Sequence, residues 1–172
     1  MSHYFYRKRN YSMIRNITVE EIPLCAGLIR ESFATVAEEF GFTPENAPRF
    51  TAFATTAERL TWQMTREGRI MRVFAENGRI AGYYLLHCLQ EDIWELNNLC
   101  VHPAFRHRMI GKTLLEDCLD MARNAGGAAV RIGIVEENQK LRRWYESFGF
   151  VHTGTQKFEF FPFTCGYMEI QL

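Results

Sequence analysis

Apolar side chains recur at helical spacing in four segments of the chain. Thr18 and Glu21 have the spacing of a capping box, which predicts a first helix over residues 19–32, continued after a bend over residues 33–40. A second helix is expected over residues 56–67, closed by Gly68. Two later helical faces consist of Ile110, Leu114, Leu115, Cys118, Leu119 and Ala122, and of Leu141, Trp144, Tyr145 and Phe148.

Other apolar segments have the length and composition of strands. Asn77 and Gly78 predict a type I′ hairpin turn, because both central positions of that turn need positive φ. A near-continuous apolar run over residues 129–135 predicts a strand buried in the middle of a sheet. Strands are expected over residues 14–18, 70–75, 80–89, 93–101, 129–135, 151–160 and 163–172.

The order of these elements predicts an α/β fold. The strand over residues 93–101, the helix after it and the strand over residues 129–135 form a right-handed crossover, which makes the two strands parallel neighbours. The flanking strands are expected to be antiparallel. The sequence therefore predicts a mixed, mostly antiparallel central sheet of six to seven strands, with helices on both faces.

The length of 172 residues suits one domain, expected over residues 13–172 after a flexible extension over residues 1–12. Hydrophobic residues make up 47% of the chain, which is ample for a core and excludes a disordered composition. The formal net charge is zero, which argues against nucleic acid as the main partner. No apolar run is long enough to cross a membrane, so no membrane partner is expected.

The five cysteines lack the paired spacing of a disulfide framework or a zinc site. Most of them lie in apolar segments, where a free thiol acts as a small hydrophobic side chain. Histidine, cysteine and carboxylate residues form no cluster with metal-ligand spacing. We therefore expect no bound metal and a reducing, cytoplasmic location.

A basic loop is expected between the strand that ends at Val101 and the next helix. The first turn of a helix has unpaired N–H groups and the positive end of the helix dipole, so it can bind an anion. Gly111 would let a ligand approach the backbone closely. An ordinary basic turn at a helix start is the alternative. The positive charge comes from Arg106, His107, Arg108 and Lys112.

Two groups of residues around this loop follow a known pattern. The first is Val101, Pro103, Phe105, Arg106, Gly111, Leu114 and Leu115, and the second is Asn138, Trp144, Tyr145, Gly149 and Phe150. They resemble the two motifs of the GNAT superfamily of acyltransferases. The first motif reads Val-x-Pro-x-(Tyr/Phe)-Arg-x-x-Gly-x-Gly before a Leu-Leu pair, and the second reads Asn, a helix with Tyr, then Gly-Phe. Both occur here in the family order, within residues 95–150.

The resemblance implies that acetyl-coenzyme A (acetyl-CoA) is the cosubstrate. It also implies that the two parallel strands splay apart, so that the pantetheine arm pairs with the backbone of Leu99 and Val101. Asn138 is expected to contact this arm, to cap the helix that follows, or both. The pyrophosphate is expected at Arg106, His107, Arg108, Met109, Ile110, Gly111 and Lys112.

Met109 departs from the family pattern, which has a glycine at this position. A side chain there crowds the approach to the pyrophosphate. We expect helical backbone at residue 109, which does not require glycine. Weaker or reshaped cofactor binding is therefore predicted, and not its loss.

Acetyl transfer to an amine requires removal of an amine proton, stabilisation of an oxyanion and protonation of the leaving thiolate. By the resemblance, Glu95 is the candidate base, directly or through a water, and Tyr145 is the candidate acid. A solvent-facing carboxylate and a core aromatic are the respective alternatives, and Glu91 and Asp92 are substitutes for the base. A backbone N–H near Leu99 is the expected oxyanion donor.

The helical segment over residues 33–66 is where family members differ, and it is expected to wall the acceptor site. Acidic residues beside aromatic side chains would receive a cationic amine there, or would form only a solvated face and a core. The residues concerned are Glu38, Glu39, Glu45, Phe40, Phe42, Phe50, Phe53 and Trp62. The two closing strands are expected to form the far wall or a homodimer contact.

The sequence thus predicts an N-acetyltransferase. It would move an acetyl group from acetyl-CoA to a primary amine of a small molecule or peptide, by direct attack in a ternary complex. The alternative is a non-catalytic acyl-CoA-binding regulatory module that kept the fold. A nucleic-acid binder that uses the N-terminal arm is a third class.

Overall fold

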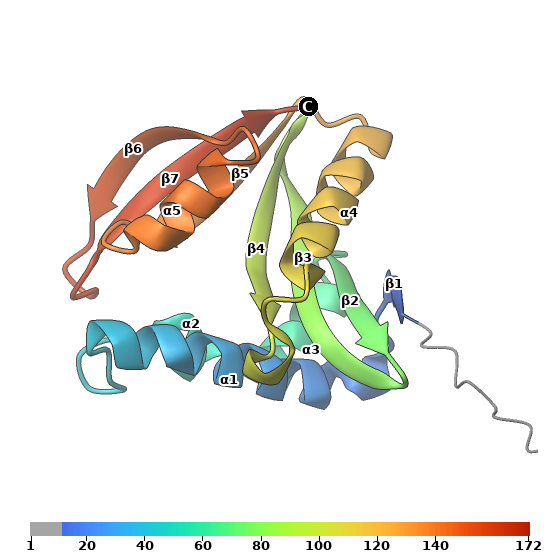
Figure 1. The fold of residues 1–172 in the computed structure, drawn as a ribbon, viewed down its shortest axis with the longest axis horizontal. Helices are drawn as coiled ribbons and strands as arrows, with labels where there is room; N and C mark the ends of the chain where they lie inside the picture. Colours follow the sequence, from blue (N-terminus) through green and yellow to red (C-terminus); the bar gives the residue numbers. More distant parts are fainter. Residues whose placement is uncertain (1–11) are drawn as a thin grey trace, which may run out of the picture.

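The computed structural model describes residues 12–172 and contains a seven-stranded sheet (Figure 1). The strand order is β1-β2-β3-β4-β5-β7-β6, with β4 and β5 parallel and the other neighbours antiparallel. The predicted mixed sheet with one parallel pair is therefore confirmed. The strands are β1 (Ser12–Asn16), β2 (Ile70–Glu76), β3 (Arg79–Gln90), β4 (Ile93–Val101), β5 (Ala129–Val135), β6 (Val151–Lys157) and β7 (Thr164–Gln171).

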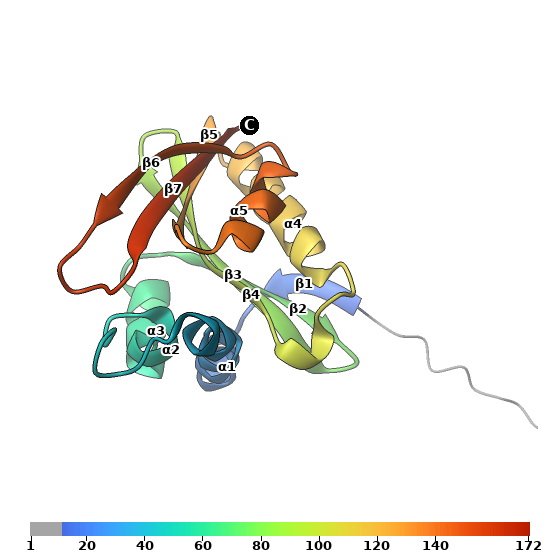
Figure 2. The same cartoon turned by 60° about the vertical axis from the view of Figure 1, so that its left-hand side comes forward.

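The helices form a layer on each face of the sheet, as predicted (Figure 2). One layer holds α1 (Ile22–Phe40), α2 (Thr51–Ala54) and α3 (Ala57–Thr65), and the other holds α4 (Ile110–Asn124) and α5 (Gln139–Glu146). Short 3₁₀ turns, η1 (Val19–Glu21) and η2 (Pro103–Phe105), precede α1 and α4. Within residues 12–172, no helix is long and apolar enough to cross a membrane. The predicted flexible extension lies outside the described residues, except for Ser12, which begins β1.

Local sequence signals account for several element ends. The Glu21 carboxylate accepts from the Thr18 N–H at 2.9 Å, which confirms the capping box. Asn77 and Gly78 have φ values of 51° and 77°, as the predicted hairpin turn requires. Gly41 closes α1 in the left-handed conformation. α1 continues through residue 33 to this point as a single helix, so the predicted bend before residue 33 is wrong.

The closing strands are shorter than the sequence predicted. β6 ends at Lys157 and β7 begins at Thr164, so the aromatic stretch between them is a loop and not a part of either strand. This loop packs its rings on one another, with the Phe161 and Phe163 centroids 4.5 Å apart. β6 is one of the two edge strands of the sheet, and the homodimer contact expected there stays a prediction.

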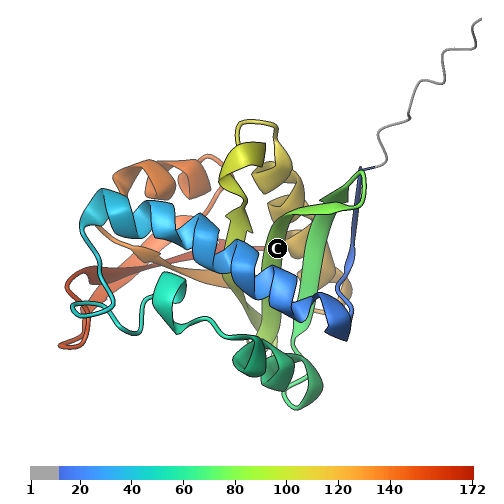
Figure 3. The same cartoon turned by 90° about the horizontal axis from the view of Figure 1, so that it is seen from below.

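The core lies on both faces of β3. Tyr84 and Leu86 pack toward α4, while Tyr83 and Leu85 pack toward α1, and all four side chains are inaccessible to solvent. α1 extends beyond the apolar cluster that contains Tyr83 and Leu85, and it runs across the base of both halves of the sheet (Figure 3). Its last turns join a third cluster with Val135 at the end of β5. α1 therefore connects the two halves of the sheet.

The cysteines have the structural role predicted for them. Cys25, Cys100 and Cys118 are buried in the core, and all five cysteines are free thiols. Burial raises the pKa of the Cys25 and Cys100 thiols to about 12. These groups therefore stay protonated at neutral pH and act as small hydrophobic side chains.

Candidate active site

The parallel strands β4 and β5 are paired over a short length and then diverge (Figure 1). The register joins Ile93 to Ala129, Trp94 to Val130 and Glu95 to Arg131, and it ends there. Beyond Glu95, β4 has no strand partner on this side within the described residues. The predicted splay is present, and the backbone along this edge of β4 is left for an extended ligand to pair with.

A β-bulge in β4 coincides with the divergence. Asn97 lies opposite Leu85 of β3, and Cys100 lies opposite Tyr83, so β4 has one more residue than β3 between these pairs. Asn98 has a φ of 54°, in the left-handed region that asparagine tolerates better than most residues. The ladder between β3 and β4 is therefore interrupted at Asn98.

Because of the extra residue, alternate side chains before and after the bulge point to different faces of the sheet. Before the bulge, Glu95 and Asn97 line a cleft next to α3. After it, Leu99 and Val101 pack against the core under α4. In a regular strand all four side chains would share one face. The Leu99 backbone, predicted to donate to an oxyanion, thus lies directly after the bulge.

The loop after β4 ends in a left-handed residue. Met109 is the N-cap of α4 with φ 63° and ψ 5°, so the prediction of helical backbone at residue 109 is wrong. His107 in the same loop has a φ of 61°. Glycine adopts this conformation freely, whereas another residue in it costs on the order of 1 kcal/mol. The Met109 side chain is 64% exposed, so core packing does not explain its presence.

Arg106 holds this loop to α1. Its guanidinium donates to the carbonyl oxygen of Ser32 and to Thr35 Oγ1, both at 3.0 Å, and to the carbonyl oxygen of Val101 at 3.2 Å. All three hydrogen bonds of this guanidinium are made to protein atoms. The Arg106 side chain therefore holds the loop against α1, and the backbone of Arg106 is the part that could contact a bound phosphate.

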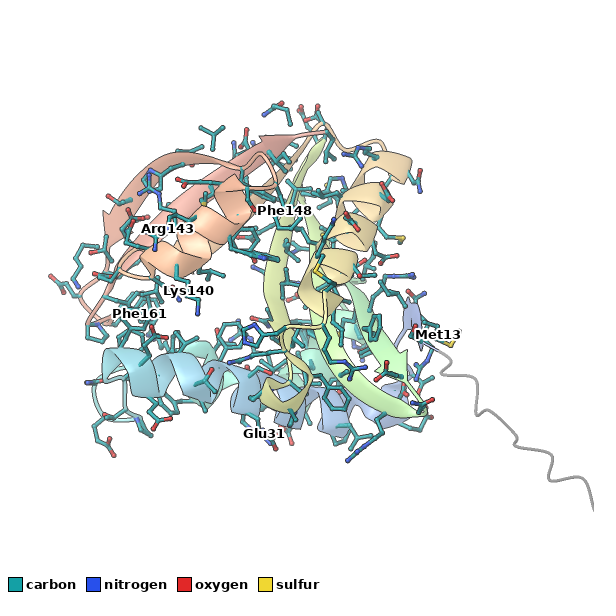
Figure 4. All side chains as sticks on the ribbon, in the orientation of Figure 1. Met13, Glu31, Lys140, Arg143, Phe148 and Phe161 are labelled. Carbon is teal, nitrogen blue, oxygen red and sulfur yellow. The ribbon has the colours of Figure 1, made fainter. Side chains whose placement is uncertain are left out.

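His102 makes a second link between the loop and α1. Its Nδ1 accepts from the Ala104 N–H at 3.1 Å, which leaves the Nε2–H to donate to the Glu31 carboxylate at 2.9 Å. Figure 4 shows Glu31 on α1, directly below the loop. Both nitrogens of His102 have partners, so this histidine positions the loop.

Two further positive side chains of the loop have acidic neighbours. Arg108 pairs with Glu76 at 2.8 Å, and Lys112 lies 3.7 Å from Glu116 on the next turn of α4. The loop therefore presents less unpaired positive charge than its sequence indicates. The N–H groups of the first turn of α4 are its other means of holding an anion.

The second motif begins at a helix cap. The Asn138 Oδ1 accepts from the Leu141 N–H at 3.0 Å and starts α5, so the capping role is confirmed. Its contact with a cofactor stays a prediction. Across from α5, a Cβ added to Gly111 would lie 3.6 Å from Trp144, an ordinary contact distance. Protein packing therefore does not require glycine at position 111.

Tyr145 is buried in the core under α4, as the alternative to a catalytic role expected. Its ring makes edge contacts with Trp144 and Phe150, at centroid distances of 4.9 and 5.3 Å. Burial raises the pKa of the Tyr145 hydroxyl above its usual value of about 10. The phenol is therefore protonated at neutral pH, the form that an acid requires.

Glu95 is the last residue of β4 that pairs with β5, and it has a histidine neighbour. The His87 Nε2 lies 3.3 Å from the Glu95 carboxylate. Burial, and then the positive charge of Arg69, lower the pKa of His87 and favour its neutral form. Glu91 and Asp92, the substitutes for the base, lie in the turn before β4, at the end of the strand where β4 and β5 meet.

A cleft of about 280 Å³ opens beside Glu95; we call it the acceptor cleft. The aromatic residues expected to bind an acceptor do not line it: Phe42 and Phe50 are buried in the third core cluster. Glu38, Glu39 and Glu45 do not line it either. Its walls are Arg49, Thr51, Ala54, Thr55, Arg59, Gln63, Arg69, Leu85, Glu95, Asn97 and Asn98.

Sequence reasoning missed the three arginines of this cleft, because they come from three separate segments. Across the part of the chain that the structure describes, no group of three or more histidine, cysteine or carboxylate side chains is placed to hold a metal ion. The side chains that line the cleft offer carboxylate, carboxamide, guanidinium and hydroxyl groups.

Comparison with known families agrees with this geometry. Residues 39–172 match the family model described as an acetyltransferase (GNAT) domain, which is more than half of the chain. The protein therefore belongs to the GNAT acetyltransferase family, and the resemblance inferred from the two motifs is confirmed. An uncharacterized N-acetyltransferase from the pepI 3′ region of Lactobacillus delbrueckii subsp. lactis is 23% identical over 145 residues, 79% of this chain and 82% of the relative.

Solved structures share the fold. The PaiA N-acetyltransferase of Thermoplasma acidophilum, in complex with coenzyme A, superposes with a TM-score of 0.81 at 19% identity, covering 94% of this chain and 99% of that one. YncA of Salmonella typhimurium, a putative acetyltransferase with acetyl-CoA, gives a TM-score of 0.70 at 23% identity, with 93% of each chain covered. At these identities the likeness concerns the fold.

Proposed function

We propose that the protein transfers the acetyl group of acetyl-CoA to a primary amine of a small molecule or peptide, by direct attack in a ternary complex. One observation carries the proposal: β4 leaves β5 at Glu95, beside the acceptor cleft. The unpaired edge of β4 and the cleft therefore meet at one point. A thioester held along the edge and an amine held in the cleft would come together there.

The residues of the splay and the loop fit acetyl-CoA. The edge of β4 from Leu99 to Val101 offers backbone groups for the pantetheine arm, and the Asn138 Nδ2 is left to contact it because Oδ1 caps α5. The first turn of α4 offers N–H groups for the pyrophosphate. Gly111 has no side chain to block access to this turn. Because protein packing does not require glycine at position 111, access for a ligand is the reason we propose for it.

The chain has a group to take the proton of the amine and a group to protonate the leaving thiolate. Glu95, or a water on it, takes the proton of the attacking amine, and His87 beside it orients the carboxylate. A C–N bond forms while the C–S bond breaks. The Tyr145 hydroxyl gives its proton to the departing sulfur, and the Leu99 N–H stabilises negative charge on the carbonyl oxygen. The proton on Glu95 passes to solvent, and the second proton that the amine nitrogen loses restores the Tyr145 hydroxyl, so that both groups return to their starting forms.

The five free cysteines support a reducing compartment, and we place the reaction in the cytoplasm. A non-catalytic acyl-CoA-binding module remains the competing function. Release of free thiol from acetyl-CoA, measured with a panel of primary amines, separates the two. Amine-dependent release supports the enzyme, whereas acetyl-CoA binding without release by any amine supports the module.

Replacing Met109 by glycine is expected to tighten acetyl-CoA binding. Glycine removes a side chain that crowds the phosphate loop, whereas the relief of left-handed strain is common to the free and the bound protein and does not change the Kd. The Kd, measured by calorimetry, should fall about three- to tenfold, or about 0.6 to 1.4 kcal/mol. Met109→Ala is the control that shortens the side chain but keeps the Cβ, so it should show less of the gain. An unchanged or weaker Kd for Met109→Gly would contradict this account.

Tyr145→Phe is expected to lower kcat about 100-fold, because the acid is lost while the ring contacts remain. Tyr83→Phe is the matched control, since the Tyr83 hydroxyl is buried without a hydrogen-bond partner within residues 12–172, and its activity should be unchanged. The raised pKa of Tyr145 also predicts a wild-type kcat that does not decline up to about pH 9.5. Equal kcat values for Tyr145→Phe and wild type would rule out the acid role.

Glu95→Gln is expected to lower kcat/KM about 100-fold at pH 7.5, through loss of the base. The deficit should narrow as the pH rises toward the amine pKa of about 10, because the free amine then needs no base. Glu91→Gln is the control that tests the nearest substitute, and it should match wild type. A deficit that stays constant with pH would mean that Glu95 positions other groups and does not take the proton.

A further inference from the structure

The acceptor cleft has more positive than negative side chains. Arg49 comes from the loop before α2, Arg59 from α3 and Arg69 from the turn before β2, and Glu95 is the one carboxylate among the lining residues. The cleft therefore favours an anion, and a second positive charge on the acceptor would be repelled.

Two of these arginines have no carboxylate partner in the described part of the chain. Arg59 makes no ion pair there, and the Arg49 guanidinium lies over the Phe160 ring at 4.4 Å. Stacking on a ring uses the face of the guanidinium and leaves the N–H groups at its edge to donate. Arg69, in contrast, already forms an ion pair with Glu67. Arg59 and Arg49 are therefore the arginines that are open to a carboxylate or phosphate.

The same cleft offers groups for an amine. Gln63 lies one turn after Arg59 on α3, is 8% exposed, and lines the cleft. Its Oε1 is buried and has no hydrogen-bond partner within residues 12–172. A buried carboxamide oxygen without a partner is costly, and an amine N–H supplies one. The Glu95 carboxylate, from β4, lines the same cleft and is a second acceptor for the amine.

The size of the cleft limits the acceptor. About 280 Å³ is near the lower end of the range for small-molecule sites, roughly 300–1,000 Å³. Leu85 and Ala54 are its apolar side chains, so little of its wall suits a long hydrocarbon. A short, polar molecule with both charges matches the volume and the lining.

We infer that the acceptor is a small primary amine that also carries a carboxylate or phosphate, bound in the cleft by Arg59 and Arg49. Its amino group lies toward Glu95 and Gln63. This inference rests on the proposed function and names the substrate class for it. It replaces the expectation of a cationic amine held by glutamates and aromatic rings.

A panel of four amines tests the class with the full chain and acetyl-CoA. The anionic probes are 4-aminobutyrate and 2-aminoethyl phosphate, the neutral-tail probe is butylamine, and the dication is 1,4-diaminobutane. Both anionic probes, or one of them, should give a kcat/KM about tenfold or more above butylamine and diaminobutane. The better of the two identifies the anion as carboxylate or phosphate. A preference for butylamine or diaminobutane would overturn the inference and leave the acetyltransferase standing.

Variants of Arg59 test the site itself. Arg59→Gln should raise KM for the preferred anionic amine about tenfold, with little change in kcat and no change for butylamine. Arg59→Lys should recover part of the affinity, since it keeps the charge. Arg66→Gln is the matched control, because Arg66 caps the same helix, lies near Trp62 and does not line the cleft. An equal loss with all amines would indicate a structural role and contradict the inference.

Calorimetry keeps the two proposals distinguishable. If no amine supports thiol release, the proposed function fails, and binding of the four probes in the presence of coenzyme A decides the inference. Binding of an anionic amine that Arg59→Gln weakens and Arg66→Gln does not would support it. Equal binding of all four probes, or binding of none, would overturn it.

Discussion

The pairing of β4 with β5 ends at Glu95, and the rest of the site depends on this limit. Had the ladder continued, the backbone of β4 would be satisfied within the sheet, and no edge would remain for a ligand. The bulge at Asn98 acts at the same place, since it turns Glu95 and Asn97 toward one face and Leu99 toward the other. α1 then fixes the separation, because its two ends pack on different halves of the sheet.

In the loop between β4 and α4, the charged side chains and the backbone have separate roles. Arg106 and His102 use their side chains to fasten the loop to α1, and Arg108 has Glu76 as a partner. We propose that the start of α4 binds the pyrophosphate through its backbone N–H groups. Met109, the N-cap in the left-handed conformation, sets the direction of the first turn of α4. Glycine would adopt the same conformation without the strain. The conspicuous positive charge in the sequence therefore serves mainly to position the loop.

Patterns within a single segment of the sequence were enough to place most of the fold. Residues 93–101 and 129–135 were predicted with their observed bounds, because each is mostly apolar and has a clear boundary signal, Pro103 after the first and Gly126-Gly127 before the second. The family motifs located the loop and α5. The bulge was missed, although the pair Asn97-Asn98 within an apolar strand is a signal for it. The left-handed backbone at Met109 was also missed, although the glycine that the family has at this position is a signal for it, and Arg49, Arg59 and Arg69 meet only through tertiary packing.

Hydrogen exchange of the full chain with and without acetyl-CoA tests the central claim most directly. If the cosubstrate lies along the free edge of β4 with its pyrophosphate on the start of α4, the amides of residues 99–101 and 110–112 should exchange more slowly when it is bound. The amides of β2, which is paired on both sides, should be unaffected. Protection confined to other segments, with none in these two, would contradict the account.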